Sequence, residues 1–184
     1  MHPLRRPTDA PLLLSGSRAA IDRFEIKQII LALGIKILEE NDIQVIWQTG
    51  RNYFEQYKSL NSKNAKVYDF IEDMNSAYSA CDLLLARAGA TTIAELLNLG
   101  IPAILVPSPN VAEDHQTHNA LALVNTKAAL TIKDDEAKWN LIGAAFDLLK
   151  NDSLQKGLST NIKQMAIPNA AERIVEEILK VCSK

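Results

Sequence analysis

The fold is decided by residues 83–95, which read LLLARAGATTIAE. An apolar run ends at Arg87, turns through Gly89 and continues with helical spacing, which predicts a strand that leads into a helix. The first backbone N–H groups of such a helix have no partner within it, and the helix dipole adds positive charge beside them. The turn at Gly89 is therefore a candidate site for a phosphate group.

A second loop from a strand to a helix follows at residues 106–120, VPSPNVAEDHQTHNA. It is rich in side chains that form hydrogen bonds. The carboxyl ends of neighbouring parallel strands lie at one edge of a sheet, and ligands bind in the crevice outside that edge. We therefore expect this loop and the turn at Gly89 to border one crevice.

The composition is typical of a globular protein that does not bind nucleic acid. A length of 184 residues suits one compact domain with a buried core. Twenty Lys and Arg against 22 Asp and Glu give a net charge of −2, and no basic run could follow a nucleic-acid backbone. The two cysteines, Cys81 and Cys182, form no metal-binding or redox motif. We expect no nucleic-acid partner, no metal site and a reducing, cytoplasmic location.

The apolar runs are short. Residues 101–107 form one of the longest, which falls far below the roughly 20 residues of a membrane-spanning helix. At the N-terminus, residues 1–11 are basic and rich in proline, but only residues 12–14 continue as an apolar run, too few for the core of an export signal. We expect neither an export signal nor a membrane anchor.

Short apolar runs alternate with helical patterns along most of the chain. Predicted strands cover residues 12–15, 43–48, 66–70, 83–86, 103–106 and 129–132. Predicted helices cover residues 20–40, 52–60, 74–80, 92–99 and 116–125, and three more follow the last strand at 135–149, 153–164 and 169–182. Several strands lack polar alternation, as is typical of strands covered on both faces. The sequence therefore predicts an α/β fold with a Rossmann-like, doubly wound parallel sheet.

The first loop allows both structural and functional interpretations. Thr92 and Glu95 have the spacing of a capping box, in which each side chain would satisfy a backbone donor at the helix start, and spacing alone favours this interpretation. Alternatively, Glu95 accepts hydrogen bonds from the ribose of a nucleotide whose diphosphate binds at the helix N-terminus. Arg87 suits a phosphate and a neighbouring carboxylate equally well.

The second loop has similar alternatives. Asp114 fits the N-cap of a helix whose first turn faces solvent. His115 and His118 are three residues apart, but no third zinc ligand accompanies them. Gln116 and Asn119 share one face of the expected helix and suit the binding of sugar hydroxyl groups.

A third strand-to-helix segment, FIEDM at residues 70–74, has two interpretations. It could be a hydrophobic staple around an acidic first turn. It could instead form a platform for a nucleobase, with the backbone of Ile71 reading the edge of the base and apolar side chains packing on its face.

Together, several motifs resemble the MurG family of bacterial glycosyltransferases. They are FIEDM (70–74), AYSACDLLLARAGATTIAE (77–95), PAILVPSP (102–109), EDHQTHNALALV (113–124) and IPNAAERI (167–174). Members of this family transfer N-acetylglucosamine (GlcNAc) from UDP-GlcNAc to lipid I, which is undecaprenyl-diphosphoryl-MurNAc-pentapeptide, and so produce lipid II for peptidoglycan. The resemblance covers about residues 35–181 and corresponds to the C-terminal, donor-binding half of a GT-B enzyme.

The resemblance implies roles for several of the matching positions. Glu95 binds the ribose hydroxyl groups, the backbone at Ile71 reads the uracil, and the pair at 115–116 faces the GlcNAc. The residues expected to bind UDP-GlcNAc are Ile71, Met74, Arg87, Gly89, Ala90, Thr91, Thr92, Glu95, His115, Gln116 and Asn119, with Phe70, Gly16 and Ser17 as further candidates.

The chain departs from the family at its N-terminus. The family's first strand leads into a loop of the form GGSxGAR that helps to hold the diphosphate, whereas here residues 15–19 read SGSRA. We expect an atypical segment at 1–34, which holds the first strand and the start of the first helix, and the remainder of the donor domain at 35–184. The N-terminal acceptor domain, with the lipid I site and the general base, is expected to be absent, as in a truncated, rearranged or mis-started product.

These expectations describe an inverting transfer that needs no metal ion or other cofactor, with no catalytic residue in this half. The complete enzyme is expected to associate with the cytoplasmic face of the cell membrane. Two further interpretations stay open: a stand-alone donor-binding subunit, similar to half of the split eukaryotic dolichol-linked GlcNAc transferase, and a nucleotide-sugar-binding module without activity.

Overall fold

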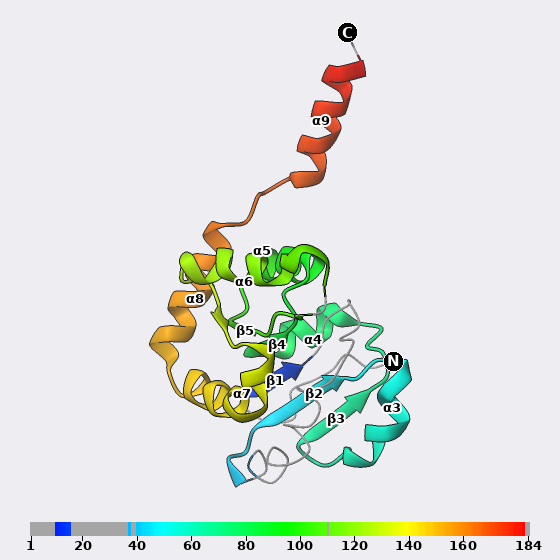
Figure 1. Ribbon diagram of the computed structural model, residues 1–184, viewed down its shortest axis with the longest axis vertical. Coiled ribbons are helices and arrows are strands. Elements are labelled where there is room, and N and C mark those ends of the chain that lie inside the picture. Colours follow the sequence, from blue (N-terminus) through cyan, green and yellow to red (C-terminus); the bar gives the residue numbers. More distant parts are fainter. Residues whose placement is uncertain (1–9, 16–36, 38–39, 110, 183–184) are drawn as a thin grey trace.

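The computed structural model describes residues 10–15, 37, 40–109 and 111–182 (Figure 1). Within these residues the strands form a six-stranded sheet in the order β3-β2-β1-β4-β5-β6, and all neighbouring strands are parallel. The strands are β1 (Leu12–Ser15), β2 (Gln44–Gln48), β3 (Ala65–Tyr68), β4 (Leu83–Ala86), β5 (Ala103–Leu105) and β6 (Leu130–Thr131). The strand order reverses between β1 and β4, so the predicted doubly wound α/β sheet is confirmed.

The helices lie close to their predicted positions. They are α3 (Arg51–Tyr57) with the short η2 (Lys58–Leu60), α4 (Met74–Ala80), α5 (Ala90–Leu99), η3 (Ala112–Asp114), α6 (His115–Asn125), α7 (Asp134–Leu149), α8 (Asp152–Gln164) and α9 (Ala170–Cys182). Most of the helix predicted at residues 20–40 lies outside the described residues, as do the candidates Gly16 and Ser17.

The core occupies both faces of the sheet. Successive residues of β4 point to opposite faces: Leu83 and Leu85 enter one buried cluster, and Leu84 and Ala86 enter the other. All four are fully buried. Helix α7 packs against the first cluster, whereas α4, α5 and α6 pack against the second. Coverage on both faces explains why these strands read as continuous apolar runs.

Helix α5 begins earlier than its sequence pattern indicates. Its N-cap is Gly89, whose backbone is extended (φ −71°, ψ 151°) and which has no side chain to cap the helix. Thr92 is therefore the third helical residue, and the predicted capping box of Thr92 and Glu95 is wrong. The helix ends at Gly100, which adopts the left-handed conformation (φ 70°) that favours glycine, and its N–H donates to the Leu96 carbonyl.

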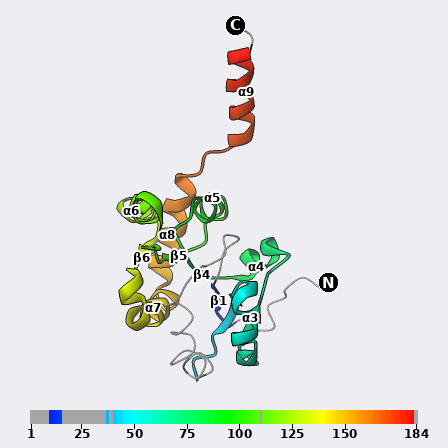
Figure 2. The same ribbon diagram turned by 45° about the vertical axis from the view of Figure 1, so that its right-hand side comes forward.

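Helix α9 stands away from the sheet in both views (Figures 1 and 2). Its residues are exposed, including the apolar side chains of Ile174, Ile178 and Val181, which recur at helical spacing. Across the described residues, the helices all fall short of the length and apolar character required to cross a membrane.

Candidate functional site

The two loops singled out in the sequence meet at the carboxyl edge of the sheet. Strands β4 and β5 are adjacent and parallel, so the segments that follow them emerge side by side. The side-chain amide of Asn119, on α6, donates to the carbonyl oxygen of Ala88, in the loop after β4, over 2.9 Å. The two loops are therefore neighbours, and a crevice that both of them border stays a prediction. They lie beside the switch point between β1 and β4, where doubly wound sheets bind ligands.

The N-terminus of α5 is open to a ligand. Ala90 and Thr91 are exposed, and the first intrahelical bond shown for this end runs from the Ile93 N–H to the Gly89 carbonyl. The N–H groups before it lack carbonyl partners within the helix, and the N-cap residue, Gly89, has no side chain that could bond them. A Cβ atom at Gly89 would meet nothing within 4 Å, so the fold itself does not require glycine there. Its missing side chain leaves the backbone accessible.

Two buried hydroxyl groups lie near this end of the sheet. Thr92 and Ser15 are both fully buried, and among the described residues neither Thr92 Oγ1 nor Ser15 Oγ has a hydrogen-bond partner. Ser15 ends β1 and Thr92 lies in the first turn of α5. A buried hydroxyl without a partner is costly, so both are candidates to bond a ligand at the switch point.

Glu95 is held by a residue that the sequence did not indicate. The hydroxyl of Tyr78, near the end of α4, donates to Glu95 Oε2 over 2.6 Å. Tyr78 is buried at 3% exposure, whereas Glu95 is half-buried. The two residues are 17 positions apart on different helices, so no local spacing could have revealed the contact.

The segment at residues 70–74 joins β3 to α4. Ile71 and Met74 are buried and Phe70 is 47% exposed. The Ile71 N–H donates to Gln48 Oε1 over 2.8 Å within the protein. A nucleobase that contacts the Ile71 backbone would therefore bond its carbonyl oxygen. Gln48, at the end of β2, was missed by the sequence analysis, because a strand residue 23 positions away gives no signal of this bond.

Asp73 caps α4. Its Oδ1 accepts from the Ser76 N–H over 3.0 Å and its Oδ2 accepts from the Ser76 hydroxyl over 2.5 Å. These hydrogen bonds, led by that of the hydroxyl, hold the pKa of Asp73 below its ordinary value. The residue before this cap is Glu72, which is exposed, so the alternative of a hydrophobic staple is wrong.

Arg87 points to a carboxylate. It is 5% exposed, and its Nη1 donates to the carbonyl oxygens of Val106 and Pro107 over 3.1 and 3.2 Å. The same nitrogen pairs with Asp134 Oδ1 at the start of α7. Of the two partners that suited Arg87, the carboxylate is the one present in the structure. Asp134 is 47 residues away, which explains why the sequence analysis missed it.

The loop after β5 is fixed by α6. Gln116 Oε1 accepts from the Ser108 N–H over 2.9 Å. Asp114 occupies the N-cap of α6 as predicted, but its carboxylate accepts from the Thr117 hydroxyl over 2.6 Å and not from a backbone N–H. His115 is exposed in the first turn. In the described parts of the chain, no group of three or more His, Cys, Asp or Glu side chains could hold a metal ion.

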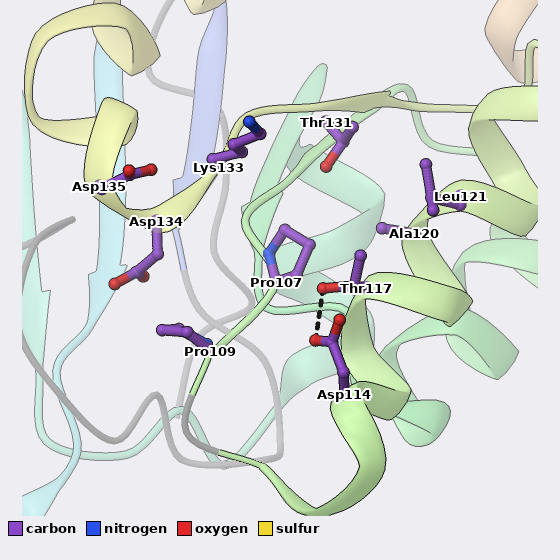
Figure 3. A pocket seen from close by; sticks show the side chains of 10 residues that line it. All are labelled: Pro107, Pro109, Asp114, Thr117, Ala120, Leu121, Thr131, Lys133, Asp134 and Asp135. Carbon is purple, nitrogen blue, oxygen red and sulfur yellow. Dashed lines mark hydrogen bonds between the residues drawn. The ribbon is translucent and has the colours of Figure 1, made fainter.

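A cavity of about 710 Å³ lies beside this loop (Figure 3). It is lined by Pro107, Pro109, Asp114, Thr117, Ala120, Leu121, Thr131, Lys133, Asp134 and Asp135. These residues belong to the loop after β5, to α6, and to the segment from β6 into α7. The cavity therefore adjoins the second loop, whereas the exposed first turn of α5 and Glu95 lie outside its lining.

Comparisons with known proteins place this geometry in a family. Residues 19–174 match the glycosyltransferase family 28 C-terminal domain. Two similar curated proteins are each named UDP-N-acetylglucosamine--N-acetylmuramyl-(pentapeptide) pyrophosphoryl-undecaprenol N-acetylglucosamine transferase. The one from Cytophaga hutchinsonii is 51% identical over 144 residues, and the match covers 78% of this chain and 39% of the relative. The one from Bacteroides thetaiotaomicron is 45% identical over 175 residues, covering 92% and 46%.

One solved structure agrees with the sequence relatives. The crystal structure of Acinetobacter baumannii MurG is similar with a TM-score of 0.75 and 28% sequence identity, and the match covers 96% of this chain and 51% of that one. The chain therefore spans about half the length of the proteins that it matches.

Proposed function

Because the chain belongs to the family of glycosyltransferase family 28 C-terminal domains, we propose that it is the donor-binding half of a MurG-like inverting glycosyltransferase. In this proposal the donor is UDP-GlcNAc, and the complete enzyme converts lipid I to lipid II in peptidoglycan synthesis. One observation carries the proposal: the uncapped N-terminus of α5 lies beside the sheet's switch point, with Glu95 one turn further along the same helix.

The diphosphate of the donor binds at the start of α5. Backbone N–H groups of Ala90, Thr91 and Thr92 donate to its oxygens, and the helix dipole adds favourable charge. Gly89 allows the phosphates to approach because it has no side chain. Gly16 and Ser17, which follow β1 in the sequence, are further candidates to bind the diphosphate. The buried hydroxyl of Thr92 supplies a further donor.

The nucleoside extends from the diphosphate toward α4. The Glu95 carboxylate accepts hydrogen bonds from the ribose hydroxyl groups, and the carbonyl oxygen of Ile71 reads the uracil. The exposed ring of Phe70 supplies apolar surface for the base, whereas Met74, expected from the sequence to bind the donor, is buried in the core and supports this segment from within. The contact between Tyr78 and Glu95 supports this arrangement, because it fixes the carboxylate beside the phosphate site.

The GlcNAc moiety faces the start of α6. Gln116 uses its Oε1 to hold Ser108, so its Nε2 donors serve a sugar hydroxyl. His115 is exposed beside it, and Asn119 ties α6 to the loop after β4. Arg87 acts through the backbone of the second loop, since its Nη1 holds the carbonyl groups of Val106 and Pro107.

The reaction then depends on charge that develops on the leaving diphosphate. The MurNAc 4-hydroxyl attacks the anomeric carbon from the opposite side while UDP departs, which inverts the configuration. Each preorganised hydrogen-bond donor contributes about 2.7 to 4 kcal/mol to transition-state stabilisation, whereas a helix dipole contributes about 0.3 to 2 kcal/mol. The N–H groups at the start of α5 therefore matter more than the dipole of the helix.

Lipid I and the general base belong to the other half of the enzyme. Holding acceptor, base and donor together can account for about 7 to 11 kcal/mol of barrier reduction. This chain alone should therefore bind the donor and transfer no GlcNAc. Because lipid I is lipid-linked, we expect the complete enzyme to work at the membrane, and the family resemblance implies its cytoplasmic face.

The test is a transfer assay with a water-soluble lipid I analogue and UDP-GlcNAc. The chain alone is compared with a chimera in which its donor domain follows the N-terminal half of the Cytophaga hutchinsonii relative. We expect turnover by the chimera and none by the isolated chain, and Glu95→Ala in the chimera should reduce it. Turnover by the isolated chain, or a folded chimera that binds acceptor but cannot use UDP-GlcNAc, would contradict the proposal.

A further inference from the structure

We propose that Tyr78 is a positioning residue for the donor site, because its hydroxyl fixes the Glu95 carboxylate in the orientation that receives the ribose. This inference rests on the proposed function and names a residue to which the sequence analysis gave no role in the site. Its basis is the hydrogen bond of 2.6 Å from the Tyr78 hydroxyl to Glu95 Oε2.

The position of the Tyr78 hydroxyl is set by the core. Its side chain belongs to the buried cluster that also contains Leu84, Leu96 and Met74, and only 3% of the residue is exposed. The ring is therefore held by β4, α4 and α5 together, and the hydroxyl group cannot follow a moving carboxylate. Glu95, in contrast, is half-buried and has a long side chain with several rotatable bonds.

The contact selects one conformation of Glu95 before the ligand arrives. A carboxylate has two oxygen atoms with several acceptor positions, so a bond to Oε2 is compatible with further hydrogen bonds from a ribose diol. Immobilising a flexible side chain on binding weakens affinity, and a protein contact that immobilises it beforehand removes that cost. The size of this cost predicts a roughly two- to tenfold effect on the dissociation constant.

If Tyr78 has only a structural role, the expected result is different. If the hydroxyl of Tyr78 only satisfies a polar group at the edge of the core, its loss should affect stability and leave ribose recognition unchanged. Tyr57 provides a matched control: it is also buried, it packs against Trp47, and it belongs to the cluster on the other face of the sheet.

The experiment is a calorimetric titration of the full chain and its Tyr78→Phe and Tyr57→Phe variants with UDP and with 2′,3′-dideoxy-UDP. We expect Tyr78→Phe to raise the dissociation constant for UDP about two- to tenfold. Tyr78→Phe should leave the dissociation constant for 2′,3′-dideoxy-UDP unchanged. Tyr57→Phe should leave the dissociation constants for both nucleotides unchanged. In a Glu95→Ala background, Tyr78→Phe should have no further effect on UDP.

Three outcomes overturn the proposal. In the first, Tyr78→Phe binds UDP as tightly as the wild-type chain does, whereas Glu95→Ala binds it more weakly. This result would support the donor site and exclude the role of Tyr78. Another is an equal loss for both nucleotides, which indicates general damage to the site. A wild-type chain that binds neither nucleotide overturns the proposed function and this inference with it. Melting temperatures of the variants show whether each remains folded.

Discussion

Arg87, which is buried, and Asp134, which is half-buried, form an ion pair that joins the end of β4 to the start of α7. Their side chains are 6% and 19% exposed. The same Arg87 nitrogen also donates to the Val106 and Pro107 carbonyl groups, so this residue sets the path of the loop after β5. Arg87 follows a strand end and its charge suits a phosphate, but its partners in the structure are Asp134 and the neighbouring loop.

Arg87→Met should lower the free energy of unfolding by about 3 kcal/mol, because it leaves the Asp134 carboxylate and two carbonyl groups without their cation. Lys58→Met is the control, since Lys58 pairs with Glu55 in an exposed position and should change stability by less than about 1 kcal/mol. Chemical denaturation measures both. Equal stability of the two variants would show that the pair does not anchor the loop.

Gly89→Ala tests whether the backbone at the start of α5 binds the diphosphate. An added Cβ meets no protein atom within 4 Å and the backbone there is extended, so the fold should tolerate the change at a cost below about 1 kcal/mol. The methyl group should nevertheless hinder the phosphates and weaken UDP binding about tenfold, the cost of roughly one hydrogen bond to a charged group.

Gly143→Ala is the matched control for this substitution. Gly143 lies within α7, and an added Cβ there also meets nothing within 4 Å. Alanine should stabilise the helix slightly and leave UDP affinity unchanged. If Gly89→Ala binds UDP as tightly as Gly143→Ala does, the diphosphate does not lie at the start of α5.

Glu95→Gln should weaken UDP binding about tenfold with little change in melting temperature. The amide oxygen of glutamine can still accept the hydrogen bond from Tyr78, but the charged acceptor for the ribose hydroxyl groups is lost. Glu55→Gln, at an exposed position on α3, serves as the control. Unchanged UDP affinity in both Glu95→Gln and Glu95→Ala would exclude Glu95 as the ribose ligand.

Gln116 has a structural contact and a proposed sugar contact, and two substitutions separate them. Gln116→Glu keeps an oxygen to accept from the Ser108 N–H, whereas Gln116→Ala removes it. Both should weaken the binding of UDP-GlcNAc more than that of UDP, because both remove the amide donor for the sugar. A parallel loss for the two ligands in Gln116→Glu would point to the loop and not to the sugar contact.

The sheet and most helices could be predicted from the sequence because their signals are local. The run from Leu83 to Ala86 is apolar at every position, which is typical of a strand covered on both faces, and the glycine after it marks the turn. The same local reasoning misplaced the start of α5. Thr92 and Glu95 have the spacing of a cap, but this spacing also occurs inside a helix, where Thr92 is buried.

The contacts that hold the site depend on packing between elements distant in sequence. Gln48 bonds Ile71 across 23 residues, and Arg87 pairs with Asp134 across 47. No periodicity identifies which of many carboxylates will meet Arg87, because the sheet order brings β4 and the start of α7 together only after folding. The sequence therefore indicated the candidate residues, and the structure supplied the partners that position them.

The central claim, that this chain is a UDP-GlcNAc-binding half, is tested most directly by calorimetric titration of the purified 184-residue chain with UDP-GlcNAc. We expect saturable binding of one ligand per chain, competition by UDP but not by GDP, and a clear loss of affinity in Glu95→Ala. An absence of saturable binding by the folded chain, or equal competition by UDP and GDP, would contradict the claim.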